Sequence, residues 1–152
     1  MLQKGRDTRA CLPDGLMKVA QDTVKGRAVV RKLVDGEFKL VLPSSADEAK
    51  NFYGFVTLDI EFKEHKGSYY DVIKEGTRAV CYTRVKDNEW KTTEFVGELA
   101  VGDKCAIAYE GENAGKVIKS EADATMEVDG LVGAMAGNEY PMVIVKLIKK
   151  GG

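Results

Sequence analysis

Few residues in this 152-residue chain have the type and spacing that catalysis or metal binding requires. His65 is the only histidine, and no cysteine lies at ligand spacing from it. A zinc site needs several such ligands, and a serine or cysteine nucleophile needs a histidine base held nearby. The sequence therefore predicts no metal site, no cofactor and no catalytic residues, and we do not expect an enzyme.

The three cysteines, Cys11, Cys81 and Cys105, are widely spaced and form no Cys-x-x-Cys pair. Cys81 and Cys105 lie in apolar runs, where we expect small, buried and unreactive thiols. Cys11 is expected on an N-terminal arm. An odd set of cysteines without a pairing pattern is typical of a reducing compartment such as the cytosol.

Three carboxylates and one glycine-containing segment could also be taken for functional groups, but both have simpler explanations. Asp59, Glu61 and Glu94 fall on expected strands, and we interpret them as outward-facing carboxylates. The glycine-containing segment at residues 111–117 superficially resembles a phosphate loop. It lacks the spacing and the Gly-Lys-Ser/Thr ending of that loop and lies between expected strands, so no helix N-terminus is available for a phosphate.

Short apolar runs alternate with turn clusters at nearly even spacing along the chain, which is typical of antiparallel strands and not of helices. We therefore expect an all-β fold, mainly antiparallel, in the form of a small β-barrel or sandwich with one short helix. Residues 1–15 lack any period and end in Pro-Asp-Gly, so they are expected to form a flexible, extended N-terminal arm. Residues 16–150 are expected to form a single β-barrel-like domain.

Two local patterns are the most specific. Asp35-Gly36 stands between β-prone runs at residues 27–34 and 37–42, and a two-residue Asp-Gly connection predicts a β-hairpin because both turn positions need positive φ. Ser45 is followed three residues later by Glu48, a capping box that predicts one or two turns of helix.

The remaining elements follow from alternation and turn residues. Residues 63–76 and 120–129 are expected to be loops, and Trp90 falls in a polar connection where it is either an interface anchor or a lid over one end of the barrel. Further strands are expected at residues 16–20, 54–62, 77–84, 92–97, 105–109, 116–119, 131–136 and 142–148.

Charge argues against nucleic acid as the main partner, because 23 basic residues are balanced by 24 acidic ones. The first forty residues are mildly basic, which indicates either a solvated surface or docking onto an acidic neighbour. An oligonucleotide-binding barrel would need basic and aromatic side chains interleaved on one face, and Tyr82 with Arg84 is the nearest approach. No apolar run has the length of a membrane span. We expect neither nucleic acid nor membrane as a partner.

Several segments together resemble the capsid decoration, or cement, proteins of tailed bacteriophages. The likeness extends from about Val24 onward and includes a final hydrophobic strand. It implies a β-barrel-like body, an N-terminal arm that lies across neighbouring capsid subunits, and frequent trimerisation. The segments that carry it are VLPSSAD (41–47), YGFVTLD (53–59), GELAVGDKCAIAY (97–109), GKVIK (115–119) and DGLVGAMAG (129–137).

The resemblance implies a virion structural protein, assembled in the host cytoplasm, that binds the outer surface of a phage head and stabilises contacts between major capsid protein subunits. Its partners would be the major capsid protein and further copies of itself, as a homotrimer. The alternatives are another phage structural component, in the tail or the head-tail connector, and a ligand-binding or nucleic-acid-binding β-barrel. We expect partner contacts at Arg6, Arg9, Leu12, Tyr69 and Trp90.

Overall fold

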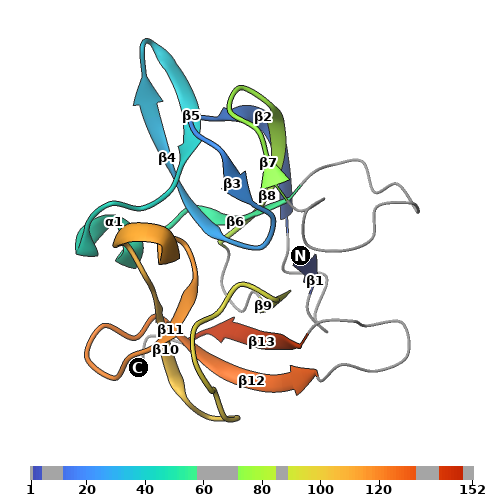
Figure 1. Cartoon of the computed structure of the whole chain (residues 1–152), viewed down its shortest axis with the longest axis vertical. Helices are drawn as coiled ribbons and strands as arrows, with labels where there is room; N and C mark the ends of the chain where they lie inside the picture. The colour runs from blue at the N-terminus through green and yellow to red at the C-terminus, as the bar shows by residue number, and fades with distance from the viewer. Residues whose placement is uncertain (1, 5–11, 58–71, 85–88, 133–140, 149–152) are drawn as a thin grey trace.

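The computed structural model of the chain describes residues 2–4, 12–57, 72–84, 89–132 and 141–148. Within these ranges the protein is built almost entirely from strands, with one short α-helix, so the predicted all-β class is confirmed. Figure 1 shows two β layers, a closed barrel in the upper half of the view and a larger sheet below it.

The upper body is a closed five-stranded barrel in the order β2-β5-β4-β6-β8. All its neighbouring strands are antiparallel except β2 and β5, which are parallel. A small pair, β3 (Thr23–Val24) and β7 (Val72–Ile73), lies beside it. The barrel strands are β2 (Leu12–Val19), β4 (Ala28–Val34), β5 (Glu37–Val41), β6 (Gly54–Thr57) and β8 (Arg78–Thr83).

The lower body is a six-stranded antiparallel sheet in the order β1-β9-β13-β12-β10-β11. A 3-10 turn, η3 (Gly111–Asn113), connects β10 to β11. The sheet therefore combines the beginning of the chain with strands from Glu89 onward. Its strands are β1 (Leu2–Lys4), β9 (Glu89–Thr92), β10 (Lys104–Ile107), β11 (Val117–Lys119), β12 (Met126–Val132) and β13 (Met142–Leu147).

One hydrophobic core joins the two bodies. Phe55 on β6 and Trp90 on β9 lie 4.8 Å apart between ring centroids, and Phe52 meets both rings edge-on at 5.5 and 5.8 Å. The indole nitrogen of Trp90 donates a hydrogen bond to the carbonyl of Tyr82 on β8, at 3.2 Å. Because aromatic packing and a hydrogen bond both cross the junction, barrel and sheet are held as one packed unit.

A second core fills the barrel itself and comes from alternate residues of its strands. Gly54 lets β6 approach β8 closely, because a Cβ at this position would lie 2.4 Å from the Tyr82 carbonyl oxygen. The buried side chains of this core are Met17, Val19, Val29, Leu40, Val56, Ile73, Ala79 and Cys81.

Both local predictions are confirmed. The hairpin forms from β4 and β5, with φ of 50° at Asp35 and 80° at Gly36. Helix α1 (Ala46–Lys50) begins after Ser45, whose hydroxyl accepts a hydrogen bond from the Glu48 amide at 3.1 Å. The Glu48 carboxylate in turn accepts from the amide of Ser44, one residue earlier than a standard capping box requires.

Several strand boundaries differ from the prediction. The strand expected at residues 92–97 lies at 89–92, and the segment expected as a loop at 120–129 enters β12 at Met126. In the strand expected at 54–62, Asp59 and Glu61 are predicted to face outward; both lie outside the described residues, and all four residues of β6 are buried. Both faces of β6 are covered, one by the barrel interior and the other by the core shared with the sheet, so the expected polar face does not exist there.

The N-terminal segment differs from the prediction in its boundary. Residues 2–4 are extended as β1, but they pair with β9 of the same molecule, Leu2 opposite Thr92. Leu12 is already the first residue of β2, so residues 12–15 belong to the barrel and not to an arm. Pro13 is the second residue of β2, in a part of the strand that pairs with β8 alone, and proline is tolerated at such strand ends and edges.

Candidate functional site

The described ranges contain no group of three or more histidine, cysteine, aspartate or glutamate side chains that could hold a metal ion. His65 lies outside those ranges. Cys81 and Cys105 are fully buried free thiols, as expected. Burial, reinforced by the negative charge of Asp103, raises the pKa of Cys105 to about 11, so this thiol stays protonated and a poor nucleophile at neutral pH.

Two hollows among the described residues are small or shallow. The first lies between α1 and the strands β10 and β11; with a volume of ≈ 40 Å³ it has room for about one water molecule. The second is an open groove of ≈ 360 Å³ at the base of the hairpin, lined in part by Arg31, Phe52 and Arg84. Arg84 is fixed there, because it donates to the Lys50 carbonyl at 2.7 Å and lies over the Phe52 ring.

The most exposed apolar feature of the barrel is the far end of the β4–β5 hairpin, which projects from the top of the molecule in Figure 1. Leu33 and Phe38 lie directly opposite each other in the hairpin register. Their exposed fractions are 64 % and 45 %, large values for apolar side chains on a paired strand. The guanidinium of Arg31 lies 3.9 Å from the centroid of the Phe38 ring and fixes its orientation.

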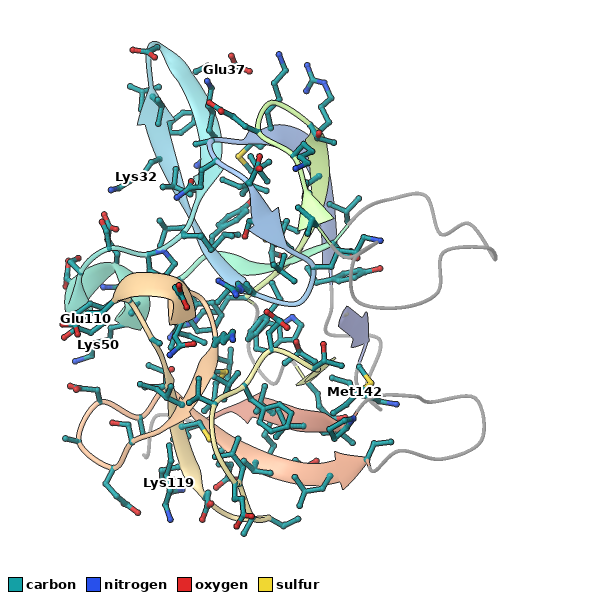
Figure 2. All side chains as sticks on the ribbon, viewed as in Figure 1. Lys32, Glu37, Lys50, Glu110, Lys119 and Met142 are labelled. Carbon is teal, nitrogen blue, oxygen red and sulfur yellow. The ribbon has the colours of Figure 1, made fainter. Side chains whose placement is uncertain are left out.

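This hairpin end leaves apolar surface in water after folding. Leu33 and Phe38 continue the inward-facing row of Leu40, but at a height where the other barrel strands no longer cover that row. A partner surface can remove both side chains from water, whereas folding of the chain alone does not. Figure 2 shows Glu37 at the tip of the hairpin and Lys32 on its flank, so charged groups surround the apolar pair.

Of the residues predicted for partner contact, only Leu12 and Trp90 lie in the described part of the chain. Arg6, Arg9 and Tyr69 lie outside the described residues, and the Leu12 backbone is part of β2. The alternative role of Trp90, a lid over one end of the barrel, stays a prediction. Trp90 is fully buried in β9, so it offers no exposed surface with which to anchor an interface. β9 lies between β1 and β13, so the segment that looked like a polar connection in the sequence is a central strand of the sheet.

Sequence reasoning missed Leu33 and Phe38 as exposed apolar residues. Apolar residues on either side of an Asp-Gly turn are normally the core face of a hairpin, and nothing in the sequence marks where the barrel ends along it. Tyr82, considered as part of a nucleic-acid face, instead packs partly buried against the shared core.

The chain matches no protein-family model, no curated protein and no solved structure. Within the described part of the chain, no helix combines the length and the apolar character that crossing a membrane requires.

Proposed function

We propose that the protein is a virion structural protein that decorates the outer surface of a tailed-phage head and stabilises contacts between major capsid protein subunits. The proposal is supported by the sequence resemblance to decoration proteins and by a surface suited to binding. The observation that carries it is the projecting hairpin end with Leu33 and Phe38 exposed opposite each other.

The hairpin provides a contact of moderate strength. Full burial of each apolar side chain contributes about 1.5–3 kcal/mol, and part of that is already gained in the free protein. A single contact of this kind is weak. A decoration protein that meets several capsid subunits at once, or that binds as a homotrimer, would gain avidity from many such contacts.

The body behind the hairpin is suited to transmitting load. The core formed by Phe52, Phe55 and Trp90 connects barrel and sheet, as described above. Arg27 adds a polar connection, because its side chain bonds the Glu94 carboxylate at 2.9 Å and the Glu112 carbonyl at 2.9 Å. A load on the barrel is therefore shared with the sheet through packed side chains and hydrogen bonds.

In this proposal the hairpin, and not the N-terminal arm, makes the first contact. Residues 2–4 are paired with β9, and residues from Leu12 onward belong to the barrel. An arm that bridges capsid subunits would have to give up its pairing with β9 first. Capsid attachment through the hairpin requires no such rearrangement.

The test uses expanded, undecorated heads of the phage that encodes this chain. Wild-type protein is expected to co-sediment with the heads at a fixed stoichiometry and to raise their rupture temperature. The Leu33→Ser/Phe38→Ser variant should bind more weakly. Val101→Ser is the matched control, because Val101 is as exposed as Leu33, at 64 %, but lies in the sheet-side loop before β10. Wild-type protein that does not bind the heads refutes the proposal.

A further inference from the structure

Four cationic residues lie opposite one another across neighbouring strands of the barrel. Lys32 on β4 pairs with Lys39 on β5, Lys39 pairs with Lys18 on β2, and Lys18 pairs with Arg78 on β8. With strands about 4.8 Å apart, the row extends about 14 Å along the barrel wall. We call Lys32, Lys39, Lys18 and Arg78 the basic ladder.

The ladder faces outward. On β2, Met17 and Val19 flank Lys18 in sequence and both point into the barrel core. Leu40 next to Lys39 and Ala79 next to Arg78 are likewise buried inside. Since side chains alternate along a strand, the ladder residues lie on the outer surface. Arg78 is exposed, and Lys18 and Lys39 are partly exposed.

Such an arrangement is unfavourable for the isolated protein, because like charges directly opposite each other on neighbouring strands destabilise a sheet. The cost is relieved at one end, where Lys32 forms an ion pair with Glu48 of α1. In the described part of the chain no ion pair involves Lys18 or Lys39. The whole chain has a formal charge of −1, so this concentration of positive charge is local.

The neighbouring chemistry indicates the kind of partner. Leu33 and Phe38 project beyond the ladder on the same hairpin and need an apolar surface, which a protein offers and a phosphate backbone does not. The aromatic ring of Phe38 lies on the opposite face of β5 from Lys39, because the two residues are adjacent along the strand. Basic and aromatic groups are therefore not interleaved on one face, as base stacking on a single strand would require.

We propose that the basic ladder binds a carboxylate-rich surface of a partner protein, in a contact separate from Leu33 and Phe38, which lie on the other face of the hairpin. The proposal that the four ladder residues bind carboxylates depends only on the pairing register of the barrel strands. Only the identification of that partner as the capsid rests on the proposed function. In that setting, the inference adds that the decorated site on the capsid is acidic.

The experiment measures binding of fluorescently labelled poly-L-glutamate by anisotropy, at low and at physiological ionic strength. The test variant is Lys18→Gln/Lys39→Gln, and the control is Lys116→Gln/Lys119→Gln, which removes the same charge around β11 of the sheet. Loss of two exposed ion pairs should weaken poly-L-glutamate binding about two- to thirty-fold. We expect that weakening in the test variant, near-wild-type binding in the control, and weaker binding of all forms at higher salt.

Folding is checked by thermal melting, where the test variant should be at least as stable as wild type because charge repulsion has been removed. Equal weakening in both variants overturns the ladder. So does an absence of poly-L-glutamate binding by wild type, or tighter wild-type binding to single-stranded DNA. Wild-type protein that binds poly-L-glutamate through the ladder but does not bind phage heads supports the ladder and refutes the capsid role.

Discussion

Replacing Trp90 tests how barrel and sheet are joined. Its side chain has no exposed surface, packs 4.8 Å from the Phe55 ring centroid, and donates a hydrogen bond to the Tyr82 carbonyl. Trp90→Ala removes the largest side chain of the shared core and leaves a cavity. Substitutions of this kind cost about 3–5 kcal/mol. Trp90→Phe keeps an aromatic ring but loses the hydrogen bond, worth about 0.5–1.5 kcal/mol, and some packing volume.

The assays are urea and thermal unfolding followed by far-ultraviolet circular dichroism, because Trp90 is the only tryptophan and its removal abolishes tryptophan fluorescence. At about 2–4 °C per kcal/mol for a chain of this size, Trp90→Ala should lower the melting temperature by about 6–20 °C. Val101→Ala is the control; Val101 is 64 % exposed. Such a surface change should stay within about 0.5 kcal/mol of wild type.

In the wild-type protein, Trp90 should show blue-shifted fluorescence and resist quenching by iodide, as expected of a fully buried indole. A cost below about 1 kcal/mol for Trp90→Ala, far under the range for buried aromatic residues, would refute the shared core as the junction between barrel and sheet. Emission typical of a solvent-exposed tryptophan would refute it independently.

Three further outcomes are expected. Gly54→Ala should destabilise by about 1–3 kcal/mol or more in urea unfolding, because the new Cβ meets the Tyr82 carbonyl oxygen; an unchanged midpoint contradicts this. Ser45→Ala should cost about 1 kcal/mol through loss of the α1 cap, whereas Ser45→Asp should retain most of the stability. Cys105, whose pKa is raised to about 11, should not react with thiol reagents at neutral pH in the folded state. The free energy of unfolding should fall as pH rises from about 9, because the unfolded thiol ionises there while the folded thiol keeps its proton. Rapid labelling of Cys105 in the native protein would disprove its burial.

Structural features that depend on a few adjacent residues could be predicted from the sequence. The Asp35-Gly36 turn needs two positive φ angles, and the Ser45 cap needs one hydroxyl near one amide, so both were predicted at the correct positions. The strand at 142–147 followed from its nearly continuous apolar run. The burial of Cys81 and Cys105 followed from their apolar neighbours.

Contacts between distant segments were beyond such reasoning. Trp90 has charged neighbours in sequence, and only its position between β1 and β13 makes it a core residue. Leu33 and Phe38 have the pattern of a core pair, and only the height of the barrel leaves them exposed. The basic ladder depends on the register between β5 and β2, which lie far apart in the chain.

The sequence by itself determined the β class, the hairpin turn and the helix cap, because backbone dihedral preferences and short-range hydrogen bonds act within a few residues. The tertiary structure alone decided which strands close the barrel, where the six-stranded sheet takes up residues 2–4, and which apolar or charged side chains remain in water. Burial and cross-strand pairing arise from segments that meet only when the chain folds, so the candidate binding surface could be found only in three dimensions.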